Sequence, residues 1–325
     1  MKTLALTVAF GLAAGGAGAQ VHQFTPKAGV QTLAVRPPVL TVRSGDTVVS
    51  PTFSLPGDYY EKEGGAWPGE VGPFYVEGAA PGDTLVVKIL KVELNRDTAV
   101  SAIRPAGLSA LATDGRLRLL NDPLPSRRFV WQLDRTRNVG ILDLPGSASR
   151  RIEIPLAPMV GRVAVAPAGE EAFGGLWPGT FGGNMDVPDI REGATVSLPV
   201  FHEGALFYFG DIHAAQGDGE VCGSGLETTA VVTMRFELVK GKRIAWPRVE
   251  DATHLMVAGS ARPLIDAFRI AHVELIDWLA AEYGFDRLEA YQVVSQVGTA
   301  RIGNVVDPLY TVVAKFPKAL LPQRK

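Results

Sequence analysis

The chain has 325 residues, 46% of them hydrophobic, which is enough for a substantial core and excludes an intrinsically disordered protein. Its 32 basic and 34 acidic side chains leave a net charge of −2. Because there is no block of basic residues to follow a phosphate backbone, we expect no nucleic acid partner.

Residues 1–19 have the pattern of a secretory signal peptide. Lys2 supplies the positive charge, and residues 4–14 form an apolar segment too short to span a bilayer comfortably. Ala17, Gly18 and Ala19 fit the small-residue cleavage pattern. We therefore expect a mature chain from residue 20, exported to the periplasm or secreted, with no membrane span after signal removal.

Segments typical of β-strands recur from residue 39 onward, separated by turns rich in the 36 glycines and 23 prolines. The longest are residues 84–94 and 228–238, both rich in β-branched side chains. This spacing predicts a mainly β protein of sandwich or barrel type. We expect one domain over residues 20–325, with two interleaved β subdomains as one possible arrangement.

A polar, aromatic loop over residues 58–69 is longer than a turn requires. Long loops in compact domains are commonly functional or disordered, and the aromatic residues here argue against disorder. Asp58, Glu61 and Glu63 are therefore candidates to face a site, and the alternative is a solvated loop.

A glycine-rich span over residues 181–223 holds most of the candidate functional side chains. These are Asp186, Asp211, His213, Asp218 and Glu220, with Asn184, Gln216 and Cys222 beside them. Glycine lets a backbone approach a ligand closely, and carboxylates with an imidazole bind divalent metals or transfer protons. Residues two apart in an extended chain point the same way, so Asp211 and His213 can reach one ligand together.

Cys222 is the only cysteine, so the chain cannot form an internal disulfide. A nucleophilic thiol and a small buried apolar side chain are the two interpretations. We favour the second, because no positively charged residue lies close in sequence to lower the pKa of the thiol.

Helical periodicity appears only near the C-terminus. Apolar residues recur at three- and four-residue steps over residues 263–283, with Pro263 suited to the first turn and Gly284 to the end. Asp286 is suited to cap a second helix. We therefore expect a small α-helical part at 263–297.

Two separated motifs carry a family resemblance. Residues 182–186 read Gly-Gly-Asn-Met-Asp, and residues 204–220 read Gly-Ala-Leu-Phe-x-x-Gly-Asp-x-His-Ala-x-Gln-Gly-Asp-Gly-Glu. Together with residues 72–85, they resemble the acetamidase/formamidase family of amide hydrolases. The resemblance implies an exported enzyme that cleaves the C–N bond of a small linear amide, such as formamide or acetamide, to a carboxylate and ammonia. It also suggests a homo-oligomer.

Amide hydrolysis requires a strong nucleophile, stabilisation of the oxyanion and a proton for the leaving amine. On this reading Asp186, Asp211 and His213 would hold a divalent metal, with Zn²⁺ as the expected ion. Glu220 or Asp218 would act as general base and acid. The list of catalytic candidates is completed by Asn184 and Gln216, as donors to the carbonyl oxygen. Structural Ca²⁺ binding by residues 217–220 is the alternative.

One position departs from the family pattern. The resemblance leads us to expect His at position 181, where this chain has Phe181. The replacement removes an imidazole and adds an apolar wall, which puts metal affinity, substrate choice and activity in question. A non-catalytic extracytoplasmic protein that binds an amide or a sugar on the same scaffold is therefore the alternative function.

Overall fold

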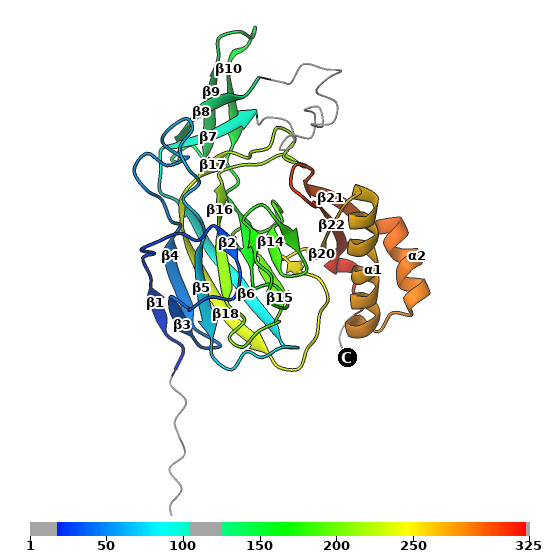
Figure 1. Ribbon diagram of the computed structural model, residues 1–325. Coiled ribbons are helices and arrows are strands. Elements are labelled where there is room, and N and C mark those ends of the chain that lie inside the picture. The colour runs from blue at the N-terminus through cyan, green and yellow to red at the C-terminus, as the bar shows by residue number, and fades with distance from the viewer. Residues whose placement is uncertain (1–17, 104–124, 323–325) are drawn as a thin grey trace, which may run out of the picture.

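The computed structural model describes residues 18–103 and 125–322, so nearly all of the expected signal peptide lies outside the described residues. Two large β-sheets dominate the described chain, with two α-helices at one side (Figure 1). This confirms the predicted mainly β fold with a helical C-terminal part. No helix among these residues is long and apolar enough to span a bilayer.

The first sheet has nine strands in the described chain. Their spatial order is β1 (Val21–Gln23), β4 (Thr47–Pro51), β18 (Ala230–Val239), β6 (Thr84–Leu94), β15 (Thr195–Pro199), β19 (Arg248–Glu250), β20 (His254–Ala261), β22 (Tyr310–Pro317) and β21 (Thr299–Asn304). Strand β6, the longest, pairs antiparallel with β18 and β15, so it lies in the interior of the sheet.

The second sheet contains eleven strands of the described residues. Its main order is β10 (Arg150–Pro155), β9 (Val139–Leu144), β8 (Arg127–Asp134), β7 (Thr98–Ile103), β17 (Glu227–Thr228), β16 (Phe207–His213), β11 (Met159–Ala164), β14 (Gly182–Asn184) and β13 (Pro178–Gly179). Strand β5 (Val71–Val76) also pairs with β16, and β3 (Leu40–Val42) pairs with β5. A small separate ladder joins β2 (Thr32–Leu33) to β12 (Phe173–Gly174).

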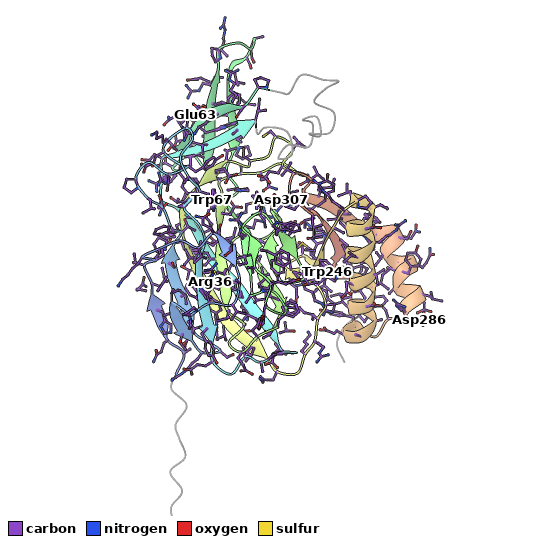
Figure 2. The ribbon with its side chains drawn as sticks, viewed as in Figure 1. Arg36, Glu63, Trp67, Trp246, Asp286 and Asp307 are labelled. Carbon is purple, nitrogen blue, oxygen red and sulfur yellow. The ribbon has the colours of Figure 1, made fainter. Side chains whose placement is uncertain are left out.

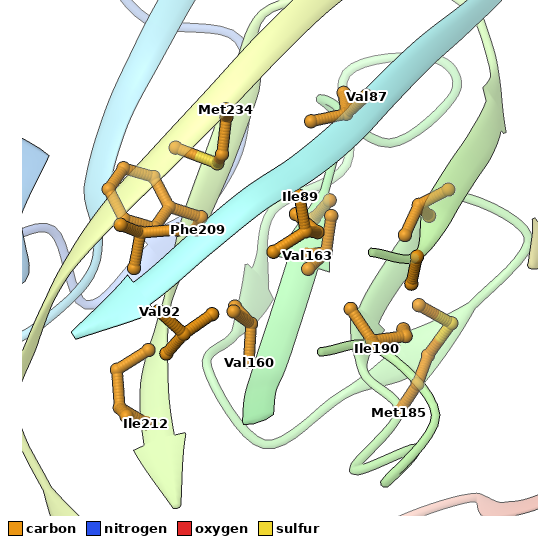
Figure 3. Close-up of a cluster of buried hydrophobic side chains, with 14 of the residues drawn as sticks. Val87, Ile89, Val92, Val160, Val163, Met185, Ile190, Phe209, Ile212 and Met234 are labelled. Carbon is orange, nitrogen blue, oxygen red and sulfur yellow. The ribbon is translucent and has the colours of Figure 1, made fainter. Parts of the chain in front are cut away.

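The main core lies between the two sheets (Figure 3). Val87 and Ile89 of β6 face Val163 of β11 and Phe209 of β16, and all four side chains are buried. Alternate residues of a strand point to the same face, so each sheet contributes one apolar face to this layer. The chain is therefore a β-sandwich over this part.

The helices cover the far end of the first sheet. Helix α1 (Leu264–Tyr283) and helix α2 (Arg287–Val297) bury a second apolar cluster against β20 and β22. Gly284 ends α1 in a left-handed conformation with φ 73°, and the Asp286 side chain accepts from two backbone N–H groups of α2. A short 3₁₀ turn (Lys318–Leu320) follows β22. The helix positions confirm the sequence-based expectation.

A buried ion pair connects the sandwich to the C-terminal strands. The Asp189 carboxylate accepts from Lys315 at 2.8 Å and from Arg301 at 3.0 Å. Burial alone would raise the pKa of Asp189, but these two cations outweigh it and hold the pKa below its usual 3.8.

Asp189→Asn is therefore expected to destabilise the protein in a pH-dependent way. A carboxyl with a depressed pKa in the folded state stabilises the fold above its unfolded pKa, and this contribution disappears as the pH falls through the folded pKa. The difference in free energy of unfolding between the two proteins should be largest near about pH 7 and shrink below about pH 4. Urea unfolding across this range measures it, and a difference independent of pH would contradict the argument.

Candidate active site

Strand β16 carries Asp211 and His213 into the site. Phe209 and Ile212 of this strand both enter the main core, although an alternating strand would place residues three apart on opposite faces. The alternation breaks at Asp211, which has a φ of 57°. This break brings both polar side chains together, with His213 Nε2 3.4 Å from Asp211 Oδ1. The sequence predicted this proximity from a regular strand, whereas the structure achieves it through an irregular one.

Left-handed backbone recurs at the site carboxylates. Asp186 has a φ of 47° and Glu220 a φ of 51°, the same region as Asp211. Non-glycine residues held in this region cost about 1–3 kcal/mol each, and such residues cluster at functional sites. The surroundings also require glycine, because a Cβ at Gly161 would lie 2.6 Å from Asp186 Oδ1 and one at Gly225 2.5 Å from His213 Nδ1. Within the predicted glycine-rich span, Gly210 has the same role, because a Cβ there would lie 1.8 Å from Glu70 Oε2.

His213 lies at the centre of a buried cluster of carboxylates. The side chains of Asp186, Asp211 and His213 have potential ligand atoms within 4.8 Å of one another, and those of His213, Glu220 and Glu227 form a second such group. Glu227 Oε2 is 3.2 Å from His213 Nε2. All five residues are buried. Each group could therefore hold a divalent metal ion.

Glu227 was not among the residues predicted from the sequence. It stands opposite His213 in the antiparallel pair of β17 and β16, a cross-strand register that sequence spacing does not reveal. The one feature of the sequence that could have indicated Glu227 is a carboxylate at the start of a buried strand.

Gln216 determines which nitrogen of His213 faces the carboxylates. Gln216 Nε2 donates to the carbonyl oxygens of Asp186 at 2.8 Å and Gly303 at 2.9 Å, so its Oε1 faces the imidazole. His213 Nδ1–H then donates to Oε1 at 2.7 Å, which leaves Nε2 directed toward Asp211 and Glu227. Gln216 therefore orients the His213 ring and is not among the residues that line the cavity.

An unprotonated Nε2 next to two carboxylates would be repelled by them, so this geometry requires a cation between the three groups. Either a proton or a metal ion meets this requirement. In the absence of a metal, burial lowers the pKa of His213, but Glu227 and Asp211 outweigh burial and raise it well above 6.5. Buried oxygens without a hydrogen-bond partner on Asp186 and Glu227 complete the donor set of a cation site.

Arg162 of β11 was also missed by the sequence reasoning. Its buried guanidinium contacts Asp211 Oδ2 at 3.3 Å and forms an ion pair with Glu70, which accepts from Trp67 Nε1 at 2.8 Å. Burial alone would raise the pKa of Asp211, but Arg162 and His213 outweigh it and hold the pKa far below its usual value. Arg162 therefore keeps Asp211 ionised in the interior.

A second polar network surrounds Asp186. Asn184 Nδ2 donates to Asp186 Oδ2 at 2.8 Å and to Asp307 Oδ2 at 2.7 Å, and Asn304 Nδ2 donates to Asp186 Oδ2 at 3.2 Å. Burial and the neighbouring carboxylates raise the pKa values of Asp186, Glu220 and Asp307 well above the usual range. Both hydrogens of the Asn184 amide are used in this network, which fixes the position of Asp186.

A cavity of about 340 Å³ opens beside this cluster. Its lining includes Gln31, Tyr59, Gly65, Trp67, Arg162, Gly175, Leu176, Asn184, Asp211, Glu220, Gly223, Glu227, Val306 and Asp307. Trp67 and Asp307, which lie far apart in the sequence, both line this cavity and are labelled in Figure 2. A concave site with convergent polar groups and strongly shifted pKa values is the usual form of an active site.

Other predicted residues lie outside the cavity lining. Asp218 is half exposed and forms an ion pair with Arg301, and Cys222 Sγ lies 3.6 Å from the carbonyl oxygen of Ser224. Phe181 is buried and stacks on Phe173, with ring centroids 5.1 Å apart, so it packs into the core.

The aromatic loop contributes to the lining through Tyr59 and Trp67, not through its carboxylates. Asp58 accepts from the backbone N–H of Leu55 at 2.8 Å and of Tyr60 at 2.9 Å, which stabilises the turn. Glu61 and Glu63 are both exposed. The loop therefore faces the site with its rings.

The fold and the cluster define a β-sandwich protein with a concave site that is lined by acidic residues and lies next to one buried histidine. The sequence profile of the Acetamidase/Formamidase family matches residues 152–322. The chain belongs to this family.

Solved structures and curated relatives agree with this assignment. The crystal structure of an acetamidase from Yersinia enterocolitica superposes with a TM-score of 0.83 at 35% identity, covering 95% of each chain. A predicted acetamidase/formamidase from Thermoanaerobacter tengcongensis gives a TM-score of 0.78 at 29% identity, covering 94% of this chain and 97% of that one. An acetamidase from Mycolicibacterium smegmatis is 28% identical over 218 residues, 52% of this chain and 53% of the relative. The chain spans about half the length of the curated relatives it matches.

Proposed function

We propose that this protein hydrolyses the C–N bond of a small linear amide and releases a carboxylate and ammonia. The observation that carries the proposal is the buried cluster of Asp186, Asp211 and His213 beside a cavity, in a chain of the acetamidase/formamidase family. The similar proteins named acetamidase and formamidase support the substrate class.

In this proposal Asp186, Asp211 and His213 hold a divalent metal ion, with Glu227 as a further carboxylate at the same histidine nitrogen. The mixed oxygen and nitrogen donors suit Zn²⁺ or a related ion. When bound, such an ion supplies Lewis-acid catalysis, which stabilises the negative charge that develops on oxygen during amide hydrolysis. Support comes from the unpartnered buried atoms Asp186 Oδ1, His213 Nε2 and Glu227 Oε2.

Residues of the chain transfer the protons and orient the metal ligands. Glu220 lines the cavity beside His213, so its carboxyl is positioned to take a proton from water and give it to the leaving nitrogen. Asp218, the other candidate, faces Arg301 instead. Gln216 orients His213 and Asn184 orients Asp186, so both amides act by positioning metal ligands rather than by contacting the carbonyl oxygen.

We also propose that the protein acts after export and assembles as a homo-oligomer. The signal-like residues 1–19 support export. Gln20, the first residue of the expected mature chain, contacts the sandwich, because its backbone N–H donates to Asp46 Oδ1 at 2.8 Å. N-terminal sequencing of protein recovered from the periplasm or medium tests the cleavage site, and light scattering measures the mass of the assembly.

Chelation is expected to abolish ammonia release, and add-back of one divalent ion is expected to restore it. The physical reason is that His213 Nε2 and the carboxylates of Asp211 and Glu227 face one another and require a cation between them. The measurement is ammonia release from formamide, acetamide and larger amides by the purified protein, before and after chelation and with each ion in turn. Activity unchanged by chelator would contradict the metal site. Tight binding of an amide or sugar, with the intact ligand recovered, would favour the non-catalytic binding protein.

A further inference from the structure

The cavity is larger than formamide or acetamide needs. At about 340 Å³ it matches the volume of about eleven water molecules, each occupying about 30 Å³ in the liquid. Acetamide has only four non-hydrogen atoms. Cavities of about 300–1,000 Å³ usually enclose ligands of drug-like size. The site therefore has room for a substantial acyl group beyond the reacting amide.

Tyr59 and Trp67 form an aromatic wall of the cavity, and two aliphatic side chains also line it. Tyr59 and Trp67 have ring centroids 5.7 Å apart at an angle of 53°, and Leu176 and Val306 complete the apolar lining. Leu176 is 43% exposed and Tyr59 is half-buried, so both side chains are partly accessible to solvent. Aromatic rings favour tilted contacts at such separations, so a further ring can pack against this wall.

The loop that carries this wall is fixed in place. Arg128 donates to the carbonyl oxygens of Tyr59 at 3.3 Å and Tyr60 at 3.1 Å, and Arg96 lies 5.4 Å from the centroid of the Tyr60 ring. The indole of Trp67 donates to Glu70 and lies under the guanidinium of Arg162, 5.5 Å from its ring centroid. The wall is thus preorganised, which lowers the entropic cost of binding.

The charge of the lining disfavours an anionic acyl group. Arg162 is the one cation among the described lining residues, and Glu70 and Asp211 already contact it. The other ionisable groups of the lining are carboxyls, which offer no positive charge to pair with a carboxylate on the acyl group.

From these observations we infer that the site takes a primary amide whose neutral acyl group carries an aromatic ring, with the ring against Tyr59, Trp67 and Leu176. The inference rests on the proposed function for the position of the amide group. It extends that function, because it makes an arylalkyl amide, such as phenylacetamide, the preferred substrate class over the shortest amides.

Binding and turnover should be measured separately. Isothermal titration calorimetry with the purified protein is expected to show phenylacetamide binding at least about tenfold tighter than acetamide. In Leu176→Ala, which removes part of the apolar lining, and in Leu176→Trp, which adds bulk to it, the ratio of the two affinities should fall at least about fivefold. Leu288→Ala changes an exposed leucine of α2 outside the cavity and should leave the ratio unchanged.

Acetamide binding as tightly as phenylacetamide, or an affinity ratio insensitive to both Leu176 variants, would overturn the inference, whatever the turnover. Ammonia release with kcat/KM at least tenfold higher for phenylacetamide than for acetamide would support both proposals. Selective binding of phenylacetamide without ammonia release from any amide would support this ligand class and overturn only the hydrolytic function.

Discussion

Asp211→Asn is expected to lower kcat/KM for amide hydrolysis by at least about a hundredfold, the scale lost when a charged or hydrogen-bonding group of an active site is removed. The substitution preserves shape but removes the negative charge that faces Arg162 at 3.3 Å and His213 at 3.4 Å. A neutral amide is a poorer metal ligand than a carboxylate and leaves the Arg162 charge less compensated. Ammonia release and bound-metal content should therefore fall together.

Two further variants sharpen this test. Gln216→Leu removes the group that orients His213 and is expected to cost about 10–100-fold in activity or metal affinity. Asp218→Asn is the matched control, since that carboxylate is half exposed and paired with Arg301, and activity should stay within about twofold. Full activity in Asp211→Asn, or a loss in Asp218→Asn as large as in Asp211→Asn, would refute the assignment of roles.

Arg162→Met is expected to lower the free energy of unfolding by about 3–5 kcal/mol, the usual cost of removing one partner from a buried ion pair. Glu70 and Asp211 would lose their shared cation while remaining buried among apolar strands. The side-chain volume is largely kept, so the loss reports on charge rather than on a cavity. Urea unfolding followed by circular dichroism measures the change.

The control for this experiment is Arg287→Met, which breaks an exposed ion pair with Asp277 and should cost less than about 1 kcal/mol. Adding Glu70→Gln to Arg162→Met should recover part of the loss, because one uncompensated charge is then removed. An effect of Arg162→Met no larger than that of Arg287→Met would mean that the buried network contributes little to stability.

Local patterns in the sequence predicted the elements well. The β-branched run at 84–94 is strand β6 with the same bounds, and the apolar stripe before Gly284 is helix α1. These features depend on neighbouring residues, whose side-chain size and spacing act within one strand or helix. The glycine-rich span was also identified as the site from its own composition, and the structure places Asp186, Asp211, His213 and Glu220 together within it.

The partners of these residues could not be predicted in the same way. Glu70 and Arg162 are 92 residues apart, and Asn184 and Asp307 are 123 apart, yet each pair is in direct contact. Asp218 has the same local signature as Glu220, but the pairing with Arg301 directs it away from the cavity. The sequence shows Phe181 where the family resemblance predicts histidine. Only the packing of the Phe181 ring on Phe173 shows that this side chain points into the core.

The sequence by itself determined the mainly β class, the C-terminal helices, the family and the short span that supplies the candidate ligands. Each of these follows from periodicity or from motifs whose residues are near in the chain. The tertiary structure decided the rest: that Glu227 meets His213 across a strand pair, that Arg162 keeps Asp211 ionised, and that Tyr59 and Trp67 form the cavity wall. Sheet pairing brings together residues of any separation, and burial then sets their charges, so neither can be read from local sequence alone.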